Sequence, residues 1–373
     1  MNQPAHTEVH VSSVHPRRPM RFAAVAAFAV VVALVAGCSN GTGGGTAVPP
    51  SNPPAASLGA GESPEASITP TKLVVGLGYI PSVQFAQFYL AQQKGYYSDG
   101  GLDVEFQNKI DPDLIPLVGA GTIDVGIGDG TSVIPAASQG IPIEYVATIY
   151  GKFPNIVFAK ASSGIKEPKD LKGKKIGTPG KYGSSWVMLQ AMLASAGLTT
   201  DVVDIVEYPE FNQEAAVEQG AVDAATGFAN NEPIQLEQHG GKAVVLRVDD
   251  VTPLPGPGLI AATKTLDAKH DAIAAFVAGT LQAMNEIKDD PAAGLDAAIK
   301  EVPELASSRE TQAAILAATI DSWAGPLQVD HGLGAIDRDG WTESITFMTG
   351  LGMVKDPVKT DDLVREDLLP AGD

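Results

Sequence analysis

The sequence predicts an α/β protein built as two lobes that face each other across a cleft. The first observation is that short apolar runs alternate with helix-forming segments from Lys72 onward, a pattern typical of parallel βαβ units in an open sheet. The second is that this alternation restarts at residue 155. The third is that apolar residues recur at helical spacing after residue 263, which indicates a helical C-terminal part.

Each lobe is defined by its expected strands and helices, with lobe I over 71–157 and 260–373 and lobe II over 158–259. The strands are predicted at 72–77, 102–107, 124–129, 143–150, 155–160, 174–180, 202–209, 223–229 and 258–263. The helices are predicted at 84–93, 112–119, 131–139, 184–197, 273–287, 291–301, 309–322 and 340–350. Strands 155–160 and 258–263 are the candidates for two hinge strands that cross between the lobes. Ser184 or Ser185 is the expected N-cap of helix 184–197.

The N-terminal segment has the pattern of an export signal. A basic cluster at 17–21 precedes an uncharged apolar run at 22–36. This run has the length of a signal-peptide core, whereas a membrane-spanning helix needs about 20 apolar residues. The motif "VAGC", which ends at Cys38, resembles the lipobox of bacterial lipoproteins, whose cysteine is acylated. We therefore expect a signal peptide over 1–37 and a lipid anchor at Cys38, which holds an exported protein to the outer face of the cytoplasmic membrane. The alternative is a free or buried cysteine after an uncleaved anchor.

Residues 38–70 are predicted to form a flexible tether. Residues 39–70 hold six Gly, six Pro and five Ser and hardly any large apolar side chain. Such a segment cannot bury enough surface to offset the entropy of ordering it. We expect it to separate the folded lobes from the membrane. Met1 and Met20 are both candidate first residues.

Composition and motifs exclude several classes of function. The formal net charge of −19 argues against a nucleic-acid partner, because binding to phosphates needs basic surfaces. His239, His270 and His331 are scattered, and the chain has one cysteine, so no zinc pattern is present. The stretch "GTPGKYGSS" at 177–185 lacks the spacing of a phosphate-binding P-loop. We expect no catalytic residues, no metal and no cofactor.

Aromatic residues are concentrated where the predicted strands end. Rings are scarce in this chain, which has 11 Phe, 8 Tyr and 3 Trp. Ligands of open α/β sheets bind beyond the carboxyl ends of the strands, and flat rings stack on planar apolar ligands. The alternative for each ring is ordinary packing at a strand end. The rings at strand ends are Tyr79, Tyr150, Phe153, Tyr182, Phe211 and Phe228.

Polar side chains accompany these rings, and arginine does not. Asp129 and Thr131, with Ser132, follow the third strand, while Ser184 and Ser185 begin a helix. Asn230, Asn231 and Glu232 follow Phe228. Clefts that hold carboxylate, sulfonate or phosphate usually contain a bidentate arginine. The absence of arginine favours a neutral planar ligand with amide-like edges. Lys181 is the one nearby cation, and an anionic ligand therefore stays an alternative.

Four segments resemble a known family, the solute-binding proteins of ABC importers, in the branch of thiamine-pyrimidine precursor binders. They are 78–106, 117–143, 165–198 and 216–236, and "GYIPSVQFAQFY" and "FANNEPIQL" look most like riboflavin binders. The resemblance implies a two-lobed periplasmic-binding-protein type II fold with two crossing strands, a permease and an ATPase as partners, and a monomer. It implies ligand-binding roles for Tyr79, Pro81, Phe85, Asp129, Thr131, Tyr182, Ser184, Phe228, Asn230 and Glu232.

The leading hypothesis is a receptor for a planar heterocyclic vitamin or precursor, riboflavin first and the thiamine pyrimidine second. One alternative is a binder of sulfonate- or nitrate-type anions for an ABC importer. An alternative of another class is an enzyme like the pyrimidine synthases of the same family. A receptor that signals through a membrane sensor is also left open.

Overall fold

The computed structural model describes residues 69–108, 114–250 and 254–370. The predicted signal peptide, Cys38 and almost all of the predicted tether lie outside these residues. Within the described ranges, no helix combines the length and the apolar character that crossing a membrane requires.

The first sheet has five strands in the order β2-β1-β3-β10-β4. The strands are β1 (Thr71–Gly76), β2 (Leu102–Gln107), β3 (Val125–Gly128), β4 (Ile143–Thr148) and β10 (Gly258–Ala262). β1 pairs in parallel with β2 and β3, whereas β10 is antiparallel to β3 and β4. Both faces of β1 are covered: Leu73 and Val75 are completely buried in the core on one face, and Val74 packs on the core of the other face. The edge strand β2 instead alternates buried and exposed residues.

The second sheet repeats this arrangement in the order β7-β6-β8-β5-β9. The strands are β5 (Asn155–Lys160), β6 (Lys175–Thr178), β7 (Asp204–Glu207), β8 (Ala224–Phe228) and β9 (Ala243–Arg247). β6 is parallel to β7 and β8, and β5 is antiparallel to β8 and β9. β9 was not predicted, although it contains the apolar run 243–246; it is a short edge strand in which Val245 is exposed and Leu246 is buried.

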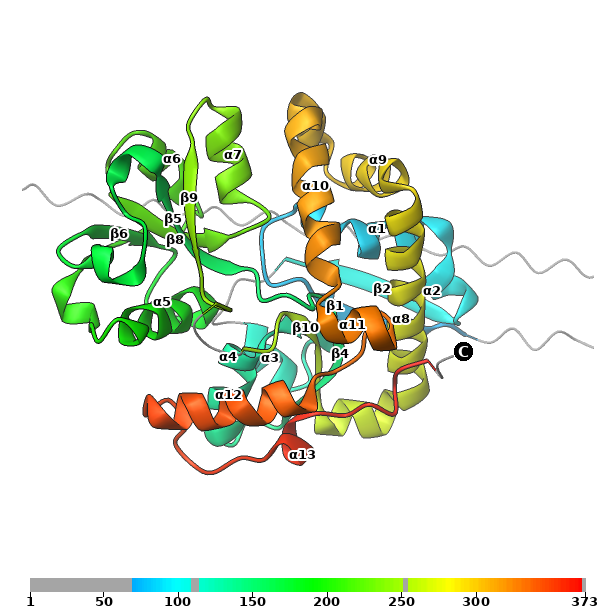
Figure 1. The fold of residues 1–373 in the computed structure, drawn as a ribbon. Coiled ribbons are helices and arrows are strands. Elements are labelled where there is room, and N and C mark those ends of the chain that lie inside the picture. Colours follow the sequence, from blue (N-terminus) through cyan, green and yellow to red (C-terminus); the bar gives the residue numbers. More distant parts are fainter. Residues whose placement is uncertain (1–68, 109–113, 251–253, 371–373) are drawn as a thin grey trace, which may run out of the picture. The chain divides into compact units, whose positions relative to one another are not determined.

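Helices cover both sheets (Figure 1). The helices between β1 and β4 are η1 (Val83–Phe85), α1 (Ala86–Lys94), α2 (Tyr96–Asp99), α3 (Leu114–Gly119) and α4 (Gly130–Ser138). Those between β5 and β9 are η2 (Ala161–Ser163), η3 (Pro168–Leu171), α5 (Gly183–Ser195), η4 (Thr200–Val202), α6 (Gln213–Glu218) and α7 (Glu232–Gln238). The C-terminal helices are α8 (Thr263–Asp289), α9 (Pro291–Glu301), η5 (Pro303–Ser308), α10 (Arg309–Trp323), α11 (Pro326–His331), α12 (Arg338–Gly350) and α13 (Thr360–Leu363).

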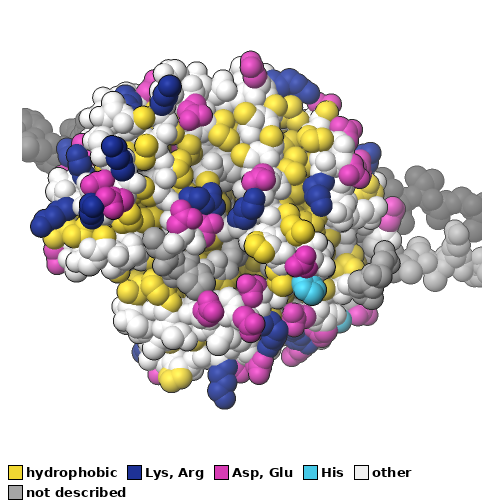
Figure 2. All heavy atoms as spheres, viewed as in Figure 1, with side chains coloured by type: hydrophobic (Ala, Val, Ile, Leu, Met, Phe, Trp, Pro, Cys, Tyr) yellow, Lys and Arg dark blue, Asp and Glu magenta, His cyan; other side chains and the backbone are white. Residues whose placement is uncertain are grey.

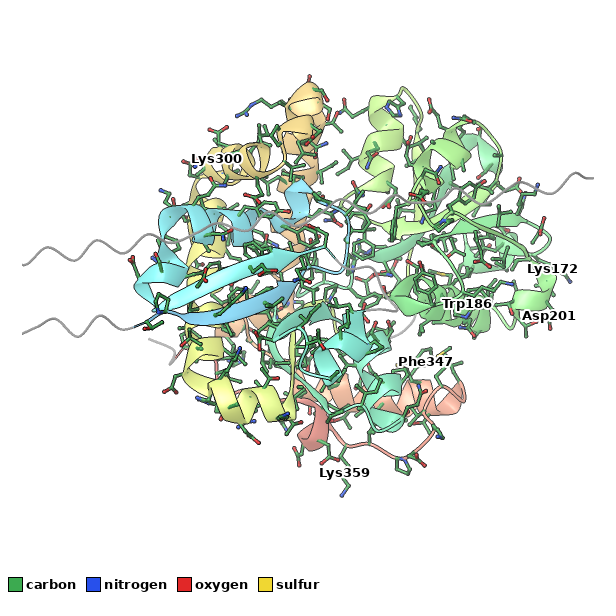
Figure 3. All side chains as sticks on the ribbon, turned by 180° about the vertical axis from the view of Figure 1, so that it is seen from behind. Lys172, Trp186, Asp201, Lys300, Phe347 and Lys359 are labelled. Carbon is green, nitrogen blue, oxygen red and sulfur yellow. The ribbon has the colours of Figure 1, made fainter. Side chains whose placement is uncertain are left out.

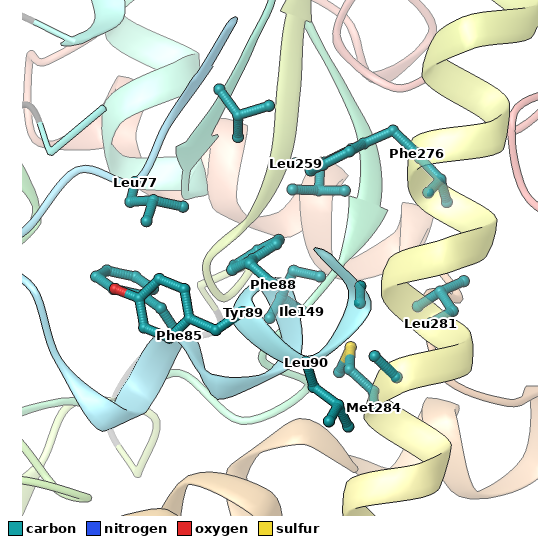
Figure 4. Packing of buried hydrophobic residues seen from close by; sticks show 14 of the residues in the cluster. Leu77, Phe85, Phe88, Tyr89, Leu90, Ile149, Leu259, Phe276, Leu281 and Met284 are labelled. Carbon is teal, nitrogen blue, oxygen red and sulfur yellow. The ribbon is translucent and has the colours of Figure 1, made fainter. Parts of the chain in front are cut away.

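The C-terminal helices pack on the first sheet. α8 contacts β10 and β4, and α13 contacts β4. On one face of the sheet, Phe88 of α1 stacks on Phe276 of α8, with ring centroids 6.1 Å apart (Figure 4). We call the first sheet with its helices, including α8–α13, lobe I, and the second sheet with α5–α7 lobe II.

The chain crosses between the sheets twice, immediately before β5 and immediately before β10. The two crossing segments are hydrogen-bonded to each other, because the N–H groups of Ile149 and Tyr150 both donate to the carbonyl of Pro257, at 3.1 and 2.8 Å. Adjacent crossings of this kind form a hinge. The predicted α/β fold with two crossovers is confirmed. The expected crossing strands, 155–160 and 258–263, do not themselves cross, because β5 and β10 each belong to one sheet.

The expected N-cap of the helix at 184–197 was wrong. α5 begins at Gly183, and Tyr182 occupies the N-cap position. Ser184 and Ser185 therefore lie in the first turn, where their side chains are at the cavity described below. A serine within the first turn can face a ligand instead of its own helix, and sequence patterns do not distinguish the two.

Candidate ligand-binding site

A cavity lies where parallel strands of both lobes end. Its wall includes residues that directly follow β1, β3 and β6, together with Gly227 and Phe228 at the end of β8. The carboxyl edges of two open α/β sheets thus meet at one site, as expected for ligand sites in this class of sheet.

The structure brings most of the predicted residues together in this wall. Those that line the cavity are Tyr79, Phe85, Asp129, Tyr150, Tyr182, Ser184, Phe211, Phe228 and Glu232. Pro81, Thr131 and Asn230 do not line it. Phe153 does not line it either, because its ring is buried in the apolar core of lobe II.

The three predicted residues outside the wall have other surroundings. Pro81 is exposed. Thr131 is buried behind the wall, and its hydroxyl donates to Asp129 Oδ1 at 2.6 Å. Asn230 is buried between the lobes, where its Nδ2 donates to Gln84 Oε1 and Thr319 Oγ1, at 2.9 and 2.8 Å.

Rings from both lobes meet at the cavity. Tyr79 of lobe I and Phe211 of lobe II form an edge-to-face pair with centroids 4.9 Å apart and planes at 84°. Phe211 has a φ of 55°, a left-handed conformation that is rare for a bulky residue and is held by its surroundings. Gly180 makes room for the ring of Tyr182, since a Cβ there would lie 2.2 Å from the ring.

Two buried carboxylates belong to the wall. Asp129 caps α4, and its Oδ1 accepts a hydrogen bond from the N–H of Ser132 at 3.0 Å. Glu232 begins α7, and its Oε2 accepts from the N–H of Phe228 at 2.7 Å. Burial raises the pKa of Asp129, against the hydrogen bonds that it accepts from Thr131 and Ser132.

The acidity of Glu232 is also set mainly by burial. Loss of hydration raises the pKa of Glu232 to about 7, and the neighbouring carboxylate of Glu214 adds to this rise. The N–H of Phe228 opposes it by stabilising the ionised form. The side chain therefore changes charge near neutral pH.

The described part of the cavity wall carries carboxylates but no basic side chain. Among the described residues that line the cavity, none is Lys, Arg or His. Lys181 is exposed and lies outside the lining. On the outer surface, by contrast, acidic and basic side chains are interspersed (Figure 2). Among the described lining residues, an anion would face two carboxylates and no compensating cation.

Sequence reasoning missed three buried glutamines of the wall, namely Gln84, Gln87 and Gln213. The first two belong to the segment "QFAQF", where glutamine recurs three residues apart among apolar residues. Polar residues at helical spacing on an otherwise apolar segment were the available signal. Gln213 follows Phe211 by two residues and has no comparable pattern.

One cluster of metal-ligand types lies elsewhere, on lobe II. Glu214, Glu218 and His239 each bring one ligand atom within 4.8 Å of the others. His239 Nδ1 is 3.1 Å from Glu214 Oε1, so a hydrogen bond between these two side chains accounts for the cluster. Lys160 and Lys242 line the adjacent hollow, and their charges oppose a bound cation.

Two lobes whose parallel strands end at one shared cavity define the class of the protein: it has the periplasmic-binding-protein-like fold. Within that class, the chain belongs to the NMT1/THI5-like family, whose match covers residues 82–294. The chain is 30% identical over 347 residues to the riboflavin-binding protein RibY of Chloroflexus aurantiacus. That similarity covers 92% of this chain and 96% of RibY.

Two further similarities are more limited. A 4-amino-5-hydroxymethyl-2-methylpyrimidine phosphate synthase of Legionella pneumophila is 29% identical over 166 residues, which cover 44% of this chain and 52% of the synthase. The alkanesulfonate-binding protein SsuA of Xanthomonas axonopodis pv. citri, solved with bound MOPS, superposes with a TM-score of 0.62 at 16% identity. It covers 80% of this chain and 99% of its own, and at this identity the likeness concerns the fold alone.

Proposed function

We propose that the protein is the extracytoplasmic solute-binding protein of an ABC importer and that it captures a planar heterocyclic vitamin or precursor between its lobes. Riboflavin is the first candidate ligand, and the thiamine pyrimidine is the second. Support comes from the family and from the similarity to RibY over 92% of this chain.

One observation favours this ligand class most strongly: the cavity wall combines rings from both lobes with buried acceptors and no cation among the described lining residues. Rings such as Tyr79 and Phe211 can pack on a flat heterocycle. The carboxylates of Asp129 and Glu232 can accept hydrogen bonds from its N–H or O–H groups. A sulfonate offers only acceptors and a negative charge, so the same wall disfavours it.

The protein is proposed to work as an anchored receptor. Acylation at Cys38 would hold it to the outer face of the cytoplasmic membrane, and residues 38–70 would let the lobes reach the permease. The permease and its ATPase would accept the loaded, monomeric protein. Because binding and release are sufficient for this role, the ligand is delivered unaltered, unlike the substrate of the synthases that match about half of the chain.

Fluorescence titration tests the ligand. Riboflavin should be quenched by the purified protein at one equivalent, because a ring stacked on Tyr79 or Phe211 loses its emission. Tyr79→Ala should weaken the quenching, and Ile80→Ala, a change at an exposed neighbour, should not. Absence of quenching together with tight binding of an aliphatic sulfonate would overturn the proposed ligand. A new product after prolonged incubation would overturn the binding role.

A further inference from the structure

Two glutamines on opposite walls of the cavity have hydrogen-bonding capacity that the protein does not use. Gln87 and Gln213 both line the cavity, and each is 1% exposed. The carboxamide oxygens of both side chains are buried and have no hydrogen-bond partner in the described part of the chain. Buried acceptors are almost always paired in folded proteins, so two unpaired ones at a single cavity need an explanation.

The two side chains come from different lobes. Gln87 is in the first turn of α1 in lobe I, and Gln213 is the first residue of α6 in lobe II. When the lobes move apart, water can reach both oxygens and satisfy them. When the lobes close, each oxygen loses that water, and the bound ligand must replace it.

Other acceptors of the wall already have partners. Gln84 Oε1 accepts from Asn230, Glu232 Oε2 accepts from the N–H of Phe228, and Asp129 Oδ1 accepts from Thr131 and from Ser132. Within the described lining, Gln87 Oε1 and Gln213 Oε1 are the buried oxygens without a partner.

We propose that Gln87 and Gln213 determine specificity by accepting hydrogen bonds from N–H or O–H donors on two opposite sides of the ligand, one donor for each lobe. This inference rests on the proposed function and narrows it. The ligand must carry donors at two separate positions, as the imide N–H and the ribityl hydroxyls of riboflavin do. A ligand with acceptors alone leaves both oxygens unpaired, and closure on it is disfavoured.

Binding measurements on matched variants test this role. Gln87→Leu and Gln213→Leu keep the approximate size and remove the acceptor, and each should weaken riboflavin binding about tenfold to hundredfold. Gln219→Leu, at an exposed position just after α6, is the control and should bind as the unchanged protein does. Thermal unfolding of each variant checks that it is folded. If both cavity variants bind riboflavin with unchanged affinity, the inference is wrong.

A ligand lacking one donor identifies the side that each glutamine contacts. N3-methylriboflavin has no imide N–H, so the unchanged protein should bind it at least tenfold more weakly than riboflavin. The variant whose missing glutamine contacts that N–H should show almost no difference between the two flavins, and the other variant should keep the full difference. Equal discrimination in both variants would contradict the proposed pairing.

Hydrogen–deuterium exchange tests the unpaired oxygens without any ligand. Removing both acceptors lowers the free-energy cost of closing an empty cleft. The double variant Gln87→Leu/Gln213→Leu without ligand should therefore be closed more of the time than the unchanged protein. Its backbone amides in segments 78–85 and 227–232 should exchange more slowly. If the unchanged protein does not bind riboflavin, riboflavin is rejected as the ligand. The exchange comparison then tests the role of the two glutamines by itself. Identical exchange in the two proteins would then overturn it.

Discussion

Two of the contacts between the lobes differ in chemistry. The inner contact, beside the cavity, consists of Asn230 of lobe II with Gln84 and Thr319 of lobe I. The outer contact consists of Phe347 of α12 and Val187 of α5, each packed against the apolar core of the other lobe. The first is polar and directional, and the second is apolar and non-directional.

The inner contact forms at only one relative position of the lobes. Asn230 is 1% exposed and Thr319 0%, and their hydrogen bond to each other is 2.8 Å long. Tyr150 is adjacent, and its burial raises the pKa of its hydroxyl, so that it stays neutral. A small displacement of the lobes would leave these buried groups unpaired.

The outer contact tolerates small displacements. Phe347 projects from α12 toward lobe II, where Trp186 of α5 belongs to the same apolar surface (Figure 3). The dispersion energy and the free energy of apolar burial depend on the contact area and not on the angle between the groups. The inner contact, next to the cavity, thus fixes the relative position of the lobes through directional hydrogen bonds. The outer contact holds the lobes together through apolar area alone.

The largest expected effect comes from breaking the inner contact. Asn230→Ala removes both interlobe donors and leaves Gln84 and Thr319 without them, which costs about 3 kcal/mol, or roughly a hundredfold in affinity. Thr319→Val keeps one of the two bonds and should lose less. Isothermal titration with riboflavin measures both. Equal, small losses would show that the inner contact is not directional.

A smaller effect is expected at the outer contact. Phe347→Ala removes a half-buried ring and should destabilise the closed state by about 2 kcal/mol. Ligand dissociation should therefore become roughly thirtyfold faster, with little change in association. The emission of Trp186 should shift as its surroundings become wetter. Thr346→Ala, at an exposed neighbour, is the control. A slower association in place of faster dissociation would contradict this role.

The pH dependence of ligand affinity should distinguish the cavity wall, which contains Glu232, from the outer contact. Burial raises the pKa of Glu232 to about 7, and a ligand donor needs the ionised carboxylate, so protons compete with the ligand. Affinity should therefore fall about tenfold as the pH drops from 8 to 6. Glu232→Gln should flatten the profile, whereas Phe347→Ala should leave its shape unchanged. If the affinity of the unchanged protein does not change between pH 6 and 8, Glu232 does not accept a hydrogen bond from the ligand.

The smallest expected effect concerns the ring pair at the cavity. Tyr79 and Phe211 lie in different lobes, and an edge-to-face pair contributes about 1 kcal/mol beyond its burial. A double-mutant cycle with Tyr79→Leu and Phe211→Leu should give a coupling of this size for riboflavin binding, about fivefold. Strict additivity would show that the rings act on the ligand separately.

The sequence alone predicted every described strand except β9, the alternation of strands with helices, and nine of the residues that line the cavity. The apolar run at 72–77 predicts a strand because burial on both faces requires continuous apolar residues. Segment 102–107 instead alternates apolar and polar residues, which is typical of a strand with one exposed face, and β2 has that burial pattern. The rings and carboxylates were found because the carboxyl ends of parallel strands meet. The same reasoning missed β9, although residues 243–246 also form an apolar run.

Only the tertiary structure decided which polar residues face the ligand. Sequence reasoning chose Asn230, but the cavity is lined by its neighbour Asn231, while Asn230 bonds to residues 146 and 89 positions away. Gln213 has no sequence signal comparable to that of Gln87, and that it shares one cavity with Gln87 became clear only in the tertiary structure. Local patterns determine local elements, whereas the partners of a buried polar group depend on how those elements pack.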